Sequence, residues 1–278
     1  MKVLKFGGTS VGSPERMKNV SKLINDGNKQ IVVLSAMSGT TNSLVEISDY
    51  YYKGNADAAA QVILALEQKY NSVIQELLQK EETRKKAIEI VGNEFNIIRS
   101  FANKQFSLAG EKSILARGEI ISTNLVQLYH EEIGVQSVLL NALDFMRVDA
   151  DGEPILSEIE TRLSKILEQY TQTTLFITQG FICVNPNEEI DNLKRGGSDY
   201  SATLIGAAIQ SQVVEIWTDI DGVHNNDPRI VKNTYPIAEL SFDEAAELAY
   251  FGAKILHPST VLPAKVKNIP VLLKNTME

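Results

Sequence analysis

Short apolar segments rich in Val, Ile and Leu recur along the chain, and longer stretches with helical spacing of apolar residues lie between them. Apolar runs of this kind are typical of strands buried on both faces of a sheet. The predicted strands are Val3–Phe6, Ile31–Leu34, Val135–Leu140, Thr174–Thr178, Val213–Thr218 and Val271–Leu273. The predicted helices are Pro14–Asn28, Glu111–Glu132, Ser157–Tyr170, Asp199–Ser211 and Ser241–Phe251. This alternation predicts an α/β fold with a largely parallel sheet covered on both faces.

Two segments interrupt the alternation. Ala56–Asn103 carries two long amphipathic helical patterns with no strand between them, which predicts a helical insertion. Phe181–Leu193 contains Asn185-Pro186-Asn187 and is interpreted as a hairpin with a turn at its tip. Because no repeat, low-complexity tract or linker divides the chain, we expect one continuous fold that could have two lobes.

The composition narrows the class of protein. Of 278 residues, 44% are hydrophobic and 22% charged, which favours a globular fold with a real core over disorder. The apolar runs are far shorter than the roughly 18 to 20 residues that a membrane-spanning helix needs. A net charge of −8 argues against nucleic-acid binding, which depends on clustered Lys and Arg. The glycine-containing start of the chain does not resemble a secretory signal, and the lone Cys183 favours a reducing cytoplasm.

Three loops rich in glycine and hydroxyl residues precede predicted helices. Lys5–Ser10 follows the first strand, and its Gly-Gly pair lets backbone N–H groups approach an anion, although a tight turn would need the same residues. Ser35–Asn42 could simply cap a helix. Lys194–Asp199 combines two cations, two glycines, a hydroxyl and a carboxylate, which favours function over a structural turn. No loop matches the Walker or dinucleotide-binding pattern.

Further charged residues lie in loops that follow predicted strands or separate predicted helices. Asp219 and Asp221 follow a strand, where parallel sheets bind ligands, so they could orient a lysine or a metal, or belong to a solvated turn. The three histidines and the single cysteine have no spacing that predicts a zinc site. Five cations lie in loops or at helix breaks of this acidic chain and indicate an anionic ligand such as a nucleoside triphosphate: Lys5, Lys194, Arg195, Arg229 and Lys254.

Four motifs in sequence order resemble the aspartokinase branch of the amino-acid kinase family. They are Lys5–Val11, Arg195–Tyr200, Trp217–Val223 with Asp227–Arg229, and Phe251–Pro258. The resemblance covers essentially the whole chain and implies a three-layer α/β/α fold with a mainly parallel central sheet. It also implies that an N-terminal lobe of about residues 1–198 binds aspartate and that a C-terminal lobe of about residues 199–278 binds ATP.

The resemblance also implies a role for individual residues. Lys5 would stabilise the transferring phosphoryl group beside Gly8, with Asp199 organising that lysine. The residues implied to bind aspartate are Ser35, Thr41, Glu119, Arg195, Gly196, Gly197 and Ser198; Arg195 would bind the α-carboxylate and Glu119 the amino group. The residues implied to bind ATP are Lys5, Gly7, Gly8, Thr218, Asp219, His224, Arg229, Lys254 and Ile255. His224 stands where close relatives often have Tyr.

The implied activity is transfer of the γ-phosphoryl group of ATP to the β-carboxylate of L-aspartate, the first step toward lysine, threonine and methionine. Mg²⁺ would be held mainly through the ATP phosphates, without dedicated protein ligands. Kinases of glutamate, N-acetylglutamate or UMP, a non-catalytic ligand-binding module and a dinucleotide-binding oxidoreductase remain alternatives.

The chain ends at Lys274–Glu278, where aspartokinases continue into ACT-type regulatory domains and, in bifunctional members, into a homoserine dehydrogenase. We therefore expect a catalytic fragment without feedback inhibition, from a parent protein that forms homo-oligomers.

Overall fold

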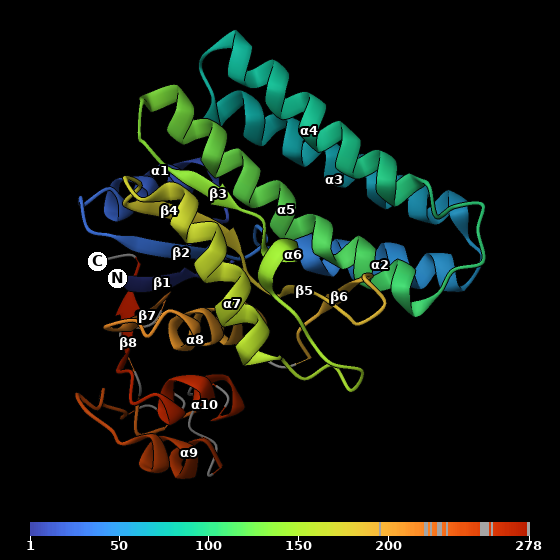
Figure 1. Ribbon diagram of the computed structural model, residues 1–278. Coiled ribbons are helices and arrows are strands. Elements are labelled where there is room, and N and C mark those ends of the chain that lie inside the picture. The colour runs from blue at the N-terminus through green and yellow to red at the C-terminus, as the bar shows by residue number, and fades with distance from the viewer. Residues whose placement is uncertain are drawn as a thin grey trace.

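A six-stranded parallel sheet forms the centre of the molecule (Figure 1). The computed structural model describes residues 1–194, 196–219, 222, 224–226, 230–231, 233–250, 256 and 258–276. The sheet order is β3-β4-β2-β1-β7-β8, and every neighbouring pair is parallel. Its strands are β1 (Lys2–Phe6), β2 (Gln30–Leu34), β3 (Val138–Leu140), β4 (Leu175–Gln179), β7 (Val214–Thr218) and β8 (Val271–Asn275). The predicted parallel α/β architecture is confirmed.

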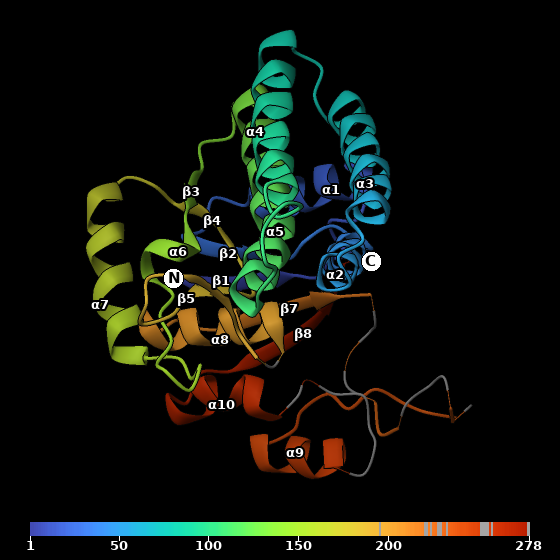
Figure 2. The same cartoon turned by 90° about the vertical axis from the view of Figure 1, so that its right-hand side faces the viewer.

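Helices cover both faces of this sheet (Figures 1 and 2). On one side of the sheet lie α1 (Pro14–Ile24), α2 (Thr40–Tyr52), α3 (Ala56–Leu77), α4 (Glu81–Arg99) and α5 (Leu108–Ile133). On the other side lie α6 (Ala142–Phe145), α7 (Leu156–Leu167) with the 3₁₀ turn η1 (Glu168–Tyr170), α8 (Gly197–Ala208), α9 (Phe242–Tyr250) and α10 (Pro258–Val266). The predicted hairpin is present as the antiparallel strands β5 (Ile182–Val184) and β6 (Ile190–Asn192).

The alternation of side chains along β1 separates two hydrophobic cores. Leu4 and Phe6 point to the core that the sheet shares with α1, α2, α3, α4 and α5. Val3 points to the opposite core, which contains residues of α7 and α8. Because successive strand residues face opposite sides, Lys5 lies on the same face as Val3. The lysine of the first glycine loop is therefore directed toward α8.

The predicted helical insertion is the antiparallel pair α3 and α4. The pair stands on the outer side of α2 and α5, away from the sheet, as Figure 2 shows. Its buried apolar residues, including Tyr70 and Phe95, continue the core of that face. The insertion is thus an additional layer that packs on the helices next to the sheet.

Several predicted boundaries were wrong by a few residues, and two of these errors have a clear local cause. The strand predicted from Val135 begins at Val138, because Gly134 ends α5 in the left-handed region (φ 76°) and the Val135 N–H then bonds to the carbonyl of His130. The helix predicted to reach Asn28 ends at Ile24. There the Asp26 carboxylate accepts the N–H of Asn28 and forms a local turn that replaces the helix.

The length and apolarity of the described helices do not suffice for any of them to cross a membrane.

Candidate active site

The carboxyl ends of four adjacent strands meet at one edge of the sheet. The register pairs Phe6 with Leu34 on one side and with Trp217 on the other, and Leu34 with Gln179. From β1 the chain continues to β2 on one side of the sheet, whereas from β7 it continues to β8 on the other side. The boundary between β1 and β7 is therefore the topological switch point, where open parallel sheets bind their ligands.

An ion pair lies at this point. Lys5 Nζ is 2.6 Å from Asp199 Oδ1, and the two side chains are 12% and 24% exposed. Asp199 belongs to the first turn of α8, on the sheet face toward which Lys5 is directed. The lysine also lies beside the first glycine loop, since a Cβ built on Gly7 would be 3.4 Å from its Nζ. The pair thus holds a half-buried cation beside backbone that can bind an anion.

The first two glycine loops are in direct contact. The Ser38 N–H donates to the carbonyl of Gly8 at 3.2 Å. A Cβ on Gly8 would lie 2.9 Å from the carbonyl oxygen of Ala36, so a larger residue would force the loops apart. Gly8 therefore permits this close approach, and the loop after β2 borders the space around Lys5.

Hydroxyl groups link the second loop to the helices on both faces of the sheet. Ser35 Oγ donates to Ser198 Oγ of α8 at 2.8 Å. Ser122 Oγ of α5 donates to the carbonyl of Ser35, also at 2.8 Å. Ser35 and Ser198, predicted from separate motifs, are therefore neighbours in space. The structure also adds Ser122, which no motif indicated.

Glu119 is a buried carboxyl group at the same loop. Its side chain lies on α5, the residue is 4% exposed, and its Oε1 accepts the N–H of Ala36 at 3.2 Å. Its Oε2 has no hydrogen-bond partner among the described residues. Burial raises the pKa of Glu119 to about 8. A cationic ligand group beside Oε2 would stabilise the charged form.

The other described residues that are predicted to bind the amino acid lie at the starts of α2 and α8. Thr41 is the second residue of α2 and is exposed. Gly196 precedes α8 with φ 65°, and Gly197 opens that helix with φ 45°. These positive φ values explain why glycines stand at both positions. Arg195 lies outside the described residues.

Of the residues predicted to bind the nucleotide, Lys5, Gly7 and Gly8 lie at the end of β1, whereas Thr218, Asp219 and His224 lie at and beyond the end of β7. Thr218 Oγ1 donates to Asp219 Oδ1 at 3.1 Å, and the Thr218 carbonyl accepts the N–H of Thr276 at 2.8 Å. Thr276 Oγ1 in turn contacts Ser10 Oγ at 2.8 Å, which connects this region to the first glycine loop. His224 Nδ1 lies 2.9 Å from Thr234 Oγ1.

Asp221, Arg229, Lys254 and Ile255 lie outside the described residues. Lys194, one of the five cations of the sequence analysis, donates to the carbonyl of Asp151. Within the described part of the chain, no group of three His, Cys, Asp or Glu side chains could hold a metal ion.

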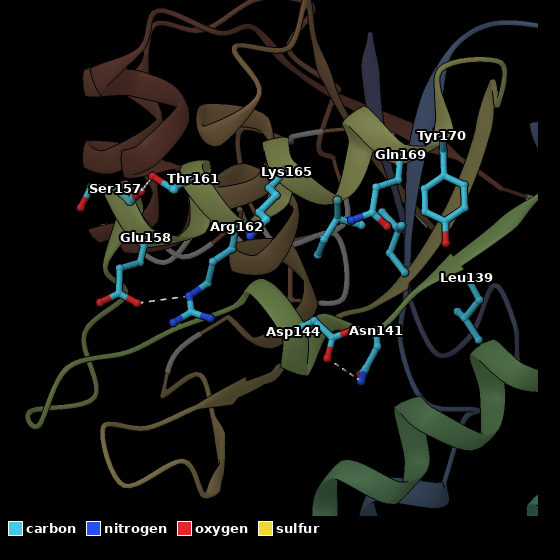
Figure 3. Close-up of a pocket in the computed structure, with 12 residues that line it drawn as sticks. Leu139, Asn141, Asp144, Ser157, Glu158, Thr161, Arg162, Lys165, Gln169 and Tyr170 are labelled. Atoms are coloured by element: carbon cyan, nitrogen blue, oxygen red, sulfur yellow. Dashed lines mark hydrogen bonds and ion pairs between the residues drawn. The ribbon is translucent and has the colours of Figure 1, made fainter.

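A separate groove of about 910 Å³ lies at the outer edge of the sheet (Figure 3). It runs between α7, which contributes Arg162 and Lys165, and the β3–α6 segment, which contributes Asn141 and Asp144. Strands β4 and β2 separate β3 from β1, so the groove is distinct from the space around Lys5. It contains none of the predicted site residues.

A glycine-loop lysine at the switch point of a parallel α/β sheet is typical of proteins that bind phosphate-containing ligands. The sequence profile of the amino acid kinase family matches residues 1–275, and the chain belongs to this family.

The proteins that are similar to this chain belong to the aspartokinase branch of the family. The chain is 33% identical over 280 residues to lysine-sensitive aspartokinase 3 of Escherichia coli, covering 99% of this chain and 62% of that protein. It is 33% identical over 290 residues to a bifunctional aspartokinase/homoserine dehydrogenase of Buchnera aphidicola, covering 99% of this chain and 35% of that protein. The crystal structure of E. coli aspartokinase III in complex with aspartate and ADP superposes with a TM-score of 0.89 at 32% identity, covering 100% of this chain and 62% of the other. The chain thus spans less than two thirds of these relatives.

Proposed function

We propose that this chain is an aspartate kinase catalytic domain that transfers the γ-phosphoryl group of ATP to the β-carboxylate of L-aspartate. The observation that carries the proposal is the Lys5–Asp199 ion pair beside Gly7 and Gly8, with the buried carboxyl of Glu119 at the adjoining loop. The similarity to an aspartokinase solved with aspartate and ADP supports this choice of substrates. The product, 4-phospho-L-aspartate, would start the route to lysine, threonine and methionine.

The chemistry requires charge neutralisation more than proton removal. A carboxylate with an ordinary pKa of about 4 is already ionised at neutral pH and is a competent nucleophile without a general base. The transferring phosphoryl group spreads negative charge over its oxygens, which positioned cations and N–H groups stabilise. Lys5 and the backbone of Gly8 would provide this stabilisation, while Asp199 holds the lysine in place.

The amino-acid side of the site would recognise both ends of aspartate. Arg195 would bind the α-carboxylate, since a guanidinium pairs with a carboxylate through two parallel hydrogen bonds. Glu119 would bind the ammonium group through the oxygen that has no other described partner. The other proposed contacts to aspartate are made by Ser35, Thr41, Gly196, Gly197 and Ser198.

The nucleotide would extend from the glycine loop over the end of β7. We propose that Gly7, Thr218, Asp219, His224, Arg229, Lys254 and Ile255 contact ATP. Mg²⁺ would be held mainly by the phosphates of ATP and would neutralise part of their charge. This division assigns aspartate to a lobe of about residues 1–198 and ATP to a lobe of about residues 199–278.

The cellular context of the protein is part of the same proposal. Cys183 is buried, and burial raises the pKa of its thiol to about 12, so the thiol stays protonated and unreactive at neutral pH. This fits a thiol maintained in a reducing cytoplasm. We also propose that the parent protein is a homo-oligomer.

The decisive experiment measures ADP release from Mg-ATP with aspartate, glutamate, N-acetylglutamate and UMP in parallel, with hydroxylamine added to trap an acyl phosphate. Aspartate-dependent ADP release together with hydroxamate is the expected result. Preference for another acceptor would overturn the substrate assignment, and ATP binding without turnover on any acceptor would contradict catalysis by this chain alone.

A further inference from the structure

Two adjacent residues of the helical insertion reach the loop that follows β2. Tyr70 of α3 is 0% exposed, and its hydroxyl lies 2.8 Å from Thr40 Oγ1, which is also fully buried. Lys69, the preceding residue, is exposed, and its Nζ donates to the carbonyl of Ser38 at 2.8 Å. Both contacts span about thirty residues of sequence and join the insertion to the same turn.

The turn that they hold is part of the candidate active site. The N–H of Ser38 bonds to the carbonyl of Gly8, so Ser38 is bound from one side by the first glycine loop and from the other by Lys69. Thr40 is the first residue of α2 and directly precedes Thr41. Gly39, which lies between Ser38 and Thr40, has φ 81°, a conformation that allows the chain to turn sharply into the helix.

Tyr70 also lies close to the buried carboxyl group. Burial raises the pKa of the Tyr70 phenol, and the nearby charge of Glu119 adds to this rise. A Cβ built on Gly118 would be 3.2 Å from Thr40 Cγ2. The tyrosine, the start of α2 and the Glu119 segment of α5 therefore form one packed unit. A change in any of the three would be transmitted to the others, because packed interiors have little free volume.

We propose that Lys69 and Tyr70 are positioning residues of the kinase site, which hold the Ser35–Thr41 loop in the geometry that binds the amino-acid substrate. This inference rests on the proposed function for the identity of the substrate, but the restraint on the loop is independent of it. The insertion then contributes to catalysis as well as to stability. Ser38 is exposed, and the insertion holds the turn that contains it. Neither residue needs to touch the substrate.

The test compares two variants with matched controls. Lys69→Met removes the ammonium group and keeps the aliphatic stem, and Lys85→Met is its control, because Lys85 lies on α4 and pairs only with Glu81 in the described structure. Tyr70→Phe removes one buried hydroxyl, and Tyr51→Phe is its control, because the Tyr51 hydroxyl donates to the carbonyl of Ile98 instead of the loop. All four variants are measured for KM of aspartate, KM of ATP and amide hydrogen exchange of residues 35–41.

Loss of one hydrogen bond, worth about 1 kcal/mol, predicts roughly a fivefold rise in KM for aspartate in Lys69→Met and in Tyr70→Phe. The KM for ATP should stay unchanged, and exchange in the loop should be faster than in either control. A purely structural role would lower the melting temperature in Tyr70→Phe and Tyr51→Phe alike without this selective change in KM.

The proposal is overturned if each variant matches its control in both KM for aspartate and loop exchange. If the unaltered chain phosphorylates another acceptor, the proposed substrate is wrong, and the same comparison is made with that acceptor. If it phosphorylates none, hydrogen exchange alone decides: faster exchange in residues 35–41 of both variants supports the restraint, and exchange equal to the controls contradicts it.

Discussion

Lys5 shows how a single residue is placed by strand geometry. Its position on β1 turns its side chain toward α8, where Asp199 opens the helix 2.6 Å away. The ion pair is partly exposed, so its role is to orient the lysine more than to stabilise the fold. The same strand carries Lys2 at its other end, 36% exposed and 3.9 Å from Glu215, remote from the glycine loop.

We predict that Lys5→Ala lowers kcat for phosphoryl transfer to aspartate by about 10²- to 10³-fold, the usual effect of removing one group that stabilises transition-state charge. Aspartate affinity should remain comparable, because the amino acid would be held by other residues. Steady-state kinetics and calorimetric aspartate binding check this, with Lys2→Ala as the control. Near-normal turnover of Lys5→Ala would disprove the assignment of Lys5.

Glu119 predicts a pH dependence of substrate binding. Its pKa is raised from 4.5 to about 8 by burial, so in the free protein the carboxyl is mostly protonated below pH 8 and ionised above it. Only the carboxylate can pair with the substrate ammonium group. We therefore expect the Kd for aspartate to fall as pH rises from about 6.5 to 8.5.

Calorimetry across this pH range measures the effect, with Glu119→Gln as the comparison. The Gln variant should bind aspartate more weakly at pH 8.5 and should lose the pH dependence. A Kd that is constant with pH in the unaltered chain would show that Glu119 does not bind the ammonium group as a titrating carboxyl.

At the scale of elements, polar contacts also join the insertion to α5, the helix that carries Glu119. Arg117 of α5 pairs with Glu94 of α4 at 2.9 Å, and the side chains are 6% and 15% exposed. The same guanidinium donates from its Nε to the carbonyl of Ser113. Arg117 stands two residues before Glu119, so α4 helps to fix the segment of α5 that carries the buried carboxyl.

We predict that Glu94→Ala lowers the free energy of unfolding by about 3 kcal/mol, because it leaves a buried guanidinium without its counter-charge. Urea denaturation followed by circular dichroism measures this change. Glu81→Ala on the same helix removes an exposed partner of Lys85 and should change stability by less than about 0.5 kcal/mol. Equal effects of the two substitutions would contradict a stabilising role for the Arg117–Glu94 pair.

At the scale of the whole molecule, the sheet separates two hydrophobic cores, and the candidate site lies at the carboxyl edge of this sheet. Residues of β1 contribute to both cores, and the glycine loop leaves the same strand. A ligand bound at the loop would therefore stabilise both halves together. Binding to the native state alone raises the apparent stability in proportion to the logarithm of ligand concentration.

We predict that Mg-ATP at a hundred times its Kd stabilises the chain by about 2.7 kcal/mol, which raises the melting temperature by roughly 5 °C for a protein of this size. Thermal unfolding with Mg-ATP and, separately, with NAD at the same concentration makes the comparison. NAD should have little effect, because the chain lacks a dinucleotide-binding glycine pattern. An equal shift with NAD would contradict the nucleotide assignment.

The sequence alone predicted the parallel α/β fold, the helical insertion and the hairpin, because alternating apolar segments and turn residues are local signals. It also indicated the glycine loops and their charged residues, since a loop that follows a strand is recognisable from neighbouring residues. Helix and strand ends were less well predicted: the Val135 N–H and the Asp26 carboxylate made local bonds that the hydrophobic pattern does not show.

Only the tertiary structure decided which of these groups meet. It brought Ser198 to Ser35 and Tyr70 to Thr40, and it placed Asp199 beside Lys5, a pairing that the sequence implied only through the family resemblance. Such contacts follow from strand order and helix packing, which no single segment encodes. For the same reason the burial of Glu119, and with it the raised pKa of its carboxyl, was decided by the packing of α5 against the loop after β2.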